Sequence, residues 1–140
     1  MAVSQSLCGA LVVWTILNTL LSHAFSIPIA KNLCLETAPL IGGPSWLHLH
    51  VKVVLDEVNK FDLVPKDATS PETLQRLVSL QPVAAEARSF RVVPGSFFSE
   101  RATQFCEDYS KDLHLVTNNC WFFAIELVQV VLRDEELSVT

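Results

Sequence analysis

The chain has 140 residues and a formal net charge of −5, with 10 basic and 15 acidic side chains and no long run of either sign. This length fits one domain, and the lack of a basic patch argues against nucleic acid or a polybasic membrane contact as a partner. No glycine-rich phosphate loop, HExxH or GxSxG motif is present, so the sequence indicates neither an enzyme nor a cofactor.

The N-terminus is typical of a secretory signal. Residues 1–22 carry no charged side chain, and the stretch Leu7–Leu21 is mostly apolar. Ala24 and Ser26 place small residues at the −3 and −1 positions of a cleavage site. We therefore expect a signal peptide over residues 1–26 and a secreted, extracellular domain over residues 27–140 that does not insert into a membrane. An uncleaved signal anchor is the alternative.

Secretion would place three cysteines in an oxidising compartment, where one disulfide and one unpaired thiol are expected. If Cys106 and Cys120 lie on successive antiparallel helices, their axial offset is roughly 9 Å. That exceeds the Cα separation of about 4.4–6.8 Å that a disulfide tolerates. The predicted bond therefore joins Cys34, on an extended segment, to Cys106 or Cys120.

The first part of the mature chain contains one ambiguous segment. Ile27–Pro44 is rich in proline and glycine and is predicted to be an extended lead-in. In Trp46–Phe61, apolar and polar residues alternate from Leu47 to Val53, as in a half-buried strand. Apolar residues also recur at helical spacing over a longer stretch, so we predict a first helix here. Its inner face would hold Leu47, Val51, Val54, Val58 and Phe61.

Three further helices are predicted. Ser70, Pro71 and Glu72 form a strong helix start, and that helix should end by Pro82. Val83–Phe90 is expected to add a short helical turn. A helix after Ser96 has an apolar face formed by Phe98, Ala102, Phe105, Tyr109 and Leu113.

The last predicted helix, Cys120–Leu132, is apolar on nearly every side, which is typical of a buried helix. The short link before it makes the last two helices neighbours. We thus expect an all-α four-helix bundle with an extended N-terminal lead-in.

The signal, the four amphipathic segments and the short mature chain resemble the short-chain four-helical cytokines, the group of granulocyte-macrophage colony-stimulating factor and its interleukin relatives. Trp46 opens the first helix, which carries Leu55-Asp56-Glu57-Val58. The resemblance implies that an acidic residue of this helix, here Glu57, contacts a shared receptor subunit. The candidate receptor-binding residues are those left facing outward on the helix: His50, Asp56, Glu57 and Lys60.

The favoured function is accordingly a secreted signalling ligand that binds a cell-surface receptor protein. A small carrier of an apolar ligand is one alternative, and it predicts a cavity of roughly 300 Å³ or more. A secreted effector or inhibitor that binds another protein is a second alternative. An enzyme comes last.

Two pairs of residues could form a metal site or a catalytic site, but we interpret both pairs as structural. His48 and His50 would suit zinc on a strand, but no third ligand is visible. On a helix the two diverge by about 200°, so they are predicted to be exposed polar positions and no metal is expected. Cys106 or Cys120 could pair with His114 as a nucleophile, yet neither lies in a recognisable catalytic motif, so a disulfide is expected instead.

Overall fold

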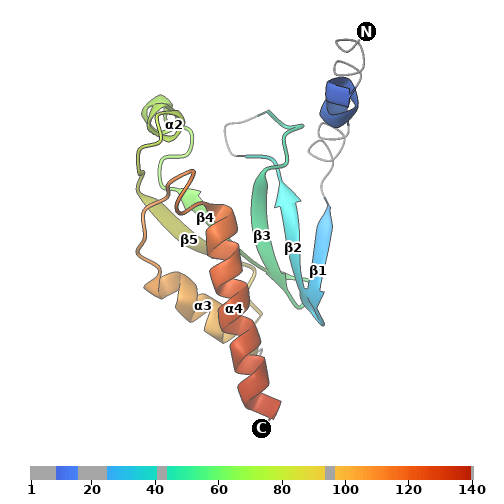
Figure 1. The fold of residues 1–140 in the computed structure, drawn as a ribbon. Coiled ribbons are helices and arrows are strands. Elements are labelled where there is room, and N and C mark those ends of the chain that lie inside the picture. Colours follow the sequence, from blue (N-terminus) through green and yellow to red (C-terminus); the bar gives the residue numbers. More distant parts are fainter. Residues whose placement is uncertain (1–8, 16–24, 41–43, 94–96, 140) are drawn as a thin grey trace.

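A five-stranded antiparallel sheet organises the structure, a computed structural model that describes residues 9–15, 25–40, 44–93 and 97–139. The strands lie side by side in chain order (Figure 1). Their bounds are β1 Ser26–Ala30, β2 Leu33–Ala38, β3 His50–Leu55, β4 Asn59–Pro65 and β5 Ala85–Phe90. The helices are α2 Pro71–Val78, α3 Phe97–Asp108 and α4 Cys120–Val139. A short helical segment also covers residues 9–15.

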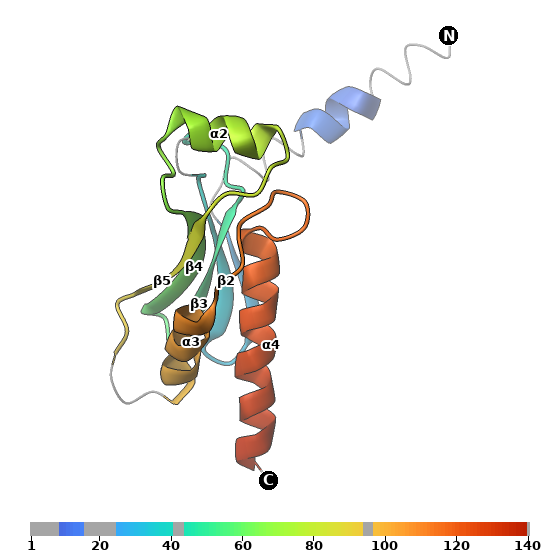
Figure 2. The ribbon, with the colours of Figure 1, turned by 90° about the vertical axis from the view of Figure 1, so that its left-hand side faces the viewer.

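Helices α3 and α4 lie against one side of the sheet, and α2 stands at one end, in the connection from β4 to β5 (Figures 1 and 2). The main core forms between the sheet and these two helices. It consists of apolar residues that alternate along the strands and face the inner sides of the helices. The fully buried members include Val51, Val53, Phe61, Leu63, Phe123 and Leu127. No helix in the described ranges combines the length and apolar character needed to cross a membrane.

The predicted all-α bundle is wrong, chiefly because Trp46–Phe61 is not a helix. From His50 onward it forms β3 and the start of β4, joined by a three-residue turn, Asp56 to Val58, between the paired residues Leu55 and Asn59. Asp56 and Glu57 have positive φ angles, 52° and 65°, which allow the chain to reverse direction here. The β-branched valines favour strands, and pairing with β2 supplies hydrogen bonds that a sequence pattern does not show. Because the resemblance to helical cytokines depended on this helix, that resemblance is wrong as well.

Two other segments also differ from their predictions. Ile27–Pro44 is not a loose lead-in, because it supplies β1 and β2, which are joined through Asn32 at φ 61°. Val83–Phe90 contains β5 in place of a helical turn. Helices are present at three of the four predicted places, as α2, α3 and α4. The protein therefore combines an antiparallel sheet with helices.

The predicted disulfide is absent from the described residues, where Cys34, Cys106 and Cys120 are free thiols. Cys34 is held in β2 between β1 and β3, so it is not on a mobile segment that could reach the core. Cys106 and Cys120 are buried on α3 and α4. The proposed signal peptide falls largely on residues 1–8 and 16–24, which lie outside the described residues.

Candidate catalytic site

The candidate site lies where β3 and β4 separate. Next to their turn the two strands pair from Leu55↔Asn59 to Val53↔Phe61, and beyond that point they diverge (Figure 1). At the open end, side chains connect the strands in place of the backbone. His50 Nε2 donates a hydrogen bond of 2.8 Å to Asp62 Oδ2. Both side chains are nearly inaccessible to solvent, at 7% and 3% exposure. A buried pair of this kind is held rigidly and acts in a low dielectric medium.

Cys120 is the third side chain at this place. It is the first residue of α4, and this end of the helix packs against β3. Cys120 lies close enough to His50 to be one of the groups that raise the pKa of that imidazole. The Cys120 thiol itself donates a weak hydrogen bond to the Leu49 carbonyl, 3.9 Å from Sγ. A carboxylate, an imidazole and a thiol therefore lie together, and these are the types of group that nucleophilic catalysis uses.

The pKa of His50 is strongly perturbed at this place. Burial by itself lowers the pKa of the imidazole, since a charged ring is poorly solvated there. The hydrogen bonds to Asp62 and Cys120, together with the negative charges of these two groups, outweigh burial and raise the pKa to about 9. With this pKa, His50 is an imidazolium at neutral pH, and its charge is balanced by Asp62.

The start of α4 supplies a further electrostatic feature. Asn119 caps the helix, since its Oδ1 accepts hydrogen bonds from the backbone N–H groups of Trp121 at 3.0 Å and Phe122 at 3.3 Å. The N–H of Cys120 belongs to the first turn and has no acceptor within the helix. A helix N-terminus favours negative charge, so Cys120 lies where an anion is stabilised.

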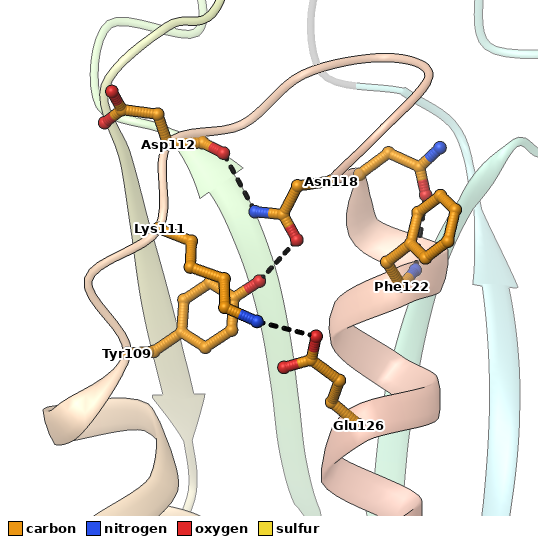
Figure 3. A network of polar contacts seen from close by, with 7 residues as sticks. Tyr109, Lys111, Asp112, Asn118, Phe122 and Glu126 are labelled. Atoms are coloured by element: carbon orange, nitrogen blue, oxygen red, sulfur yellow. Dashed lines mark hydrogen bonds and ion pairs between the residues drawn. The ribbon is translucent and has the colours of Figure 1, made fainter.

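Polar contacts hold the segment that leads into α4 (Figure 3). The Tyr109 hydroxyl donates to Asn118 Oδ1 at 2.7 Å, and Asn118 Nδ2 donates to the Asp112 carbonyl at 2.8 Å. Lys111 Nζ donates to Glu126 Oε1 of α4 at 2.8 Å. These bonds fix the segment between α3 and α4, which ends directly before Cys120.

The contacts of His114 and Cys106, the other two candidate residues, indicate structural roles. His114 Nδ1 accepts bonds from the N–H groups of Val116 and Thr117, and its Nε2 donates to the Leu80 carbonyl. Burial, and secondarily the charges of Asp62 and Glu107, raise the pKa of Cys106 to about 12. Cys106 thus stays a neutral thiol, and Cys120 is paired with His50, not with His114.

The predicted receptor-binding residues do not form one surface. His50 is 5% exposed, whereas it was expected to face solvent. Asp56 and Glu57 occupy the β3–β4 turn at the far end of β3 from His50. Lys60 on β4 forms a half-exposed ion pair with Glu36 on β2 at 3.0 Å. The structure does not test receptor binding itself, which stays a prediction.

The grouping of His50, Asp62 and Cys120 was not predicted from the sequence, because the three residues are far apart in the chain. The alternating pattern before Val53 was the available signal for His50 on a strand. Asn119 before the apolar helix was the signal for a capped helix that begins at Cys120. Asp62, which is buried in β4, had no signal in the sequence.

Metal and ligand sites are not apparent in the described parts of the chain. There, no three His, Cys, Asp or Glu side chains converge on a common point that could hold a metal ion. Cavities of about 370 and 440 Å³ adjoin α2 and have largely polar linings. A smaller cavity of about 230 Å³ adjoins Lys31, Asp56 and Phe98. None of these three includes Cys120 or His50. Comparison with protein-family models, curated proteins and solved structures gives no match to this chain.

Proposed function

We propose that the protein is a cysteine-dependent hydrolase or acyl transferase in which Cys120 is the nucleophile, His50 the general base and acid, and Asp62 the group that orients His50. The buried hydrogen bond between His50 and Asp62, with Cys120 close to the same imidazole, carries the proposal. The same three roles occur on unrelated folds, so the geometry is the ground for it, not the architecture.

The first half of the reaction transfers an acyl group to the enzyme. Cys120 loses its proton to solvent, and the thiolate formed beside the His50 imidazolium attacks an amide or ester carbonyl carbon to form a C–S bond. The N–H of Cys120 and the positive end of α4 stabilise the carbonyl oxygen as it becomes negative. The tetrahedral species then collapses, the bond to the leaving amine or alcohol breaks, and His50 donates its proton to that group.

The second half releases the acyl group. His50 removes a proton from water, the resulting hydroxide attacks the thioester, and the C–S bond breaks. The proton stays on His50, the sulfur is released as a thiolate, and a carboxylic acid leaves. If an amine or alcohol takes the place of water, the same steps transfer the acyl group. Asp62 keeps its charge throughout and balances the imidazolium in each half.

The proposal is tested first by thiol reactivity, which needs no knowledge of the substrate. The folded protein is treated with iodoacetamide, and modification at Cys34, Cys106 and Cys120 is followed by peptide mass spectrometry. Cys120 should react fastest, and Cys106 should stay unmodified because its pKa is near 12. His50→Gln should slow modification of Cys120 at least tenfold, since it removes the positive charge beside the sulfur.

Activity is tested with fluorogenic peptide amides, esters and thioesters. Turnover should be lost in Cys120→Ala, and a mass increase equal to one acyl group should appear on Cys120 of the unmutated protein. Cys34→Ser is the matched control and should keep both turnover and labelling. Equal Cys120 labelling rates in the unmutated protein and His50→Gln would overturn the catalytic assignment.

A further inference from the structure

A backbone carbonyl at the site is shared by the nucleophile and its neighbour. The oxygen of Leu49 accepts a 3.0 Å hydrogen bond from the indole Nε1 of Trp121. The same oxygen lies 3.9 Å from Cys120 Sγ and accepts the weak thiol hydrogen bond. Leu49 directly precedes His50, so this carbonyl belongs to the peptide unit that ends at the base. Trp121 directly follows the nucleophile. The Leu49 oxygen thus connects the segment that carries His50 to the start of the helix that carries Cys120.

Without the hydrogen bond from the indole, the Leu49 carbonyl would oppose catalysis. It stabilises Cys120 as a thiol, because only S–H can donate a hydrogen bond to it. Once the thiol has lost its proton, the negative end of the same carbonyl dipole faces a negative sulfur. The indole N–H binds that oxygen and draws its charge away from the sulfur. It also fixes the orientation of the peptide unit next to His50.

We propose that Trp121 is a positioning residue of the catalytic site: its indole N–H holds the Leu49 carbonyl and thereby sets the geometry and charge around the Cys120–His50 pair. This inference rests on the proposed function. Trp121 donates to the residue directly before β3, the strand that carries His50, while its own backbone belongs to α4, the helix that carries Cys120. The bond therefore connects the start of β3 to the start of α4, where relative movement would separate sulfur from imidazole.

The first test uses Trp121→Phe, which keeps an aromatic ring and removes the N–H. The rate of Cys120 modification by iodoacetamide is measured from pH 5 to pH 10. We expect the rate at pH 7 to fall at least fivefold and the midpoint of the pH profile to move to higher pH. The control is Trp46→Phe, a matched change at an exposed tryptophan, which should leave the profile unchanged.

A second measurement uses the unmutated protein, so that it does not depend on the variant folding. The chain has three tryptophans, and ¹⁵N labelling gives each a separate indole N–H resonance. Trp14→Phe and Trp46→Phe assign the resonance of Trp121 by elimination. This resonance should move with the pH dependence of Cys120 alkylation, and it should move again when Cys120 is alkylated.

The outcomes separate the two proposals. If Cys120 is not preferentially reactive in the unmutated protein, the proposed function fails. If Cys120 is reactive but the Trp121 indole resonance does not follow it, the positioning role is overturned. A folded Trp121→Phe protein with an unchanged pH profile also overturns it, while leaving the catalytic assignment intact.

Discussion

At the scale of single residues, the ion pair between His50 and Asp62 is the most consequential feature. The two groups lie on different strands and are almost completely buried, and Asp62 Oδ1 has no hydrogen-bond partner. Buried ion pairs recover the cost of desolvation only when their geometry is good, so such a pair is weak support for stability alone. Its position beside a thiol at a helix N-terminus gives it a functional explanation.

Asp62→Asn tests this explanation at the residue scale. An amide keeps the size of the side chain but removes the charge that raises the pKa of His50. We expect Cys120 alkylation at pH 7 to slow by at least tenfold, with the protein still folded by circular dichroism. Asp67→Asn, a neutralisation at an exposed loop position, is the control and should react at the original rate. An unchanged rate in Asp62→Asn would show that the carboxylate has no role in the site.

At the scale of secondary-structure elements, the β3–β4 hairpin decides the fold. Its turn requires two successive residues at positive φ, which costs free energy for any residue with a side chain, and glycine avoids this cost. The chain has Asp56 and Glu57 there. The burial of Val53 and Phe61 on the two paired strands offsets this backbone cost, because both side chains are completely inaccessible to solvent.

Glu57→Gly should therefore stabilise the protein. The substitution relieves the strained backbone at φ 65° and removes no hydrogen bond described for the side chain. We expect the free energy of unfolding to rise by about 0.5 kcal/mol, since the greater flexibility of glycine in the unfolded chain offsets part of the gain. Urea denaturation measures the change. Glu57→Ala keeps the Cβ atom and should give no such gain; equal stabilisation by both variants would rule out backbone strain as the cause.

At the scale of the whole molecule, the stability of the fold should depend on the protonation of His50. Its ordinary pKa is 6.5, and the folded protein raises that pKa to about 9. The folded state therefore binds the proton more tightly than the unfolded state. The resulting stabilisation is fully present below pH 6.5 and is lost as the pH rises through 9.

This linkage predicts a measurable slope. The His50 contribution to the free energy of unfolding should fall by up to about 3 kcal/mol between pH 6.5 and pH 9. Urea denaturation at several pH values measures the fall for the unmutated protein, and His50→Gln supplies the reference without a titrating group at this position. Parallel pH dependences for the two proteins would contradict a raised pKa at His50.

Export of the chain is a second whole-molecule prediction, and it rests on the uncharged apolar N-terminus. Cleavage after Ser26 would remove the first residue of β1, which pairs with Glu36, and the Phe25 carbonyl that accepts a bond from Thr37 N at 3.1 Å. N-terminal sequencing of protein from the culture medium should begin at Ile27. Recovery of cell-associated protein that retains Met1 would contradict cleavage.

Sequence patterns located the helices better than the strands. α2 begins at Pro71 behind Ser70 because proline suits the first helical turn. α4 begins at Cys120 behind a capping asparagine. In Trp46–Phe61 the apolar spacing fitted both a helix and two paired strands, so only the partner strands could decide. A local pattern contains no information about β2, which donates and accepts the hydrogen bonds that hold β3.

By itself, the sequence determined the position of α4, the start of α2 and many of the apolar residues that fill the core. Those properties follow from neighbouring residues and their spacing along the chain. The predicted burial of α4 on nearly every side is wrong, because Phe122 and Ile125 are 44% and 50% exposed. The tertiary structure alone decided that β3 and β4 separate beside α4 and that His50, Asp62 and Cys120 meet there. The first two residues are twelve positions apart and the third is seventy positions from His50. Side chains this far apart become a site only when the sheet and the helix that carry them pack together.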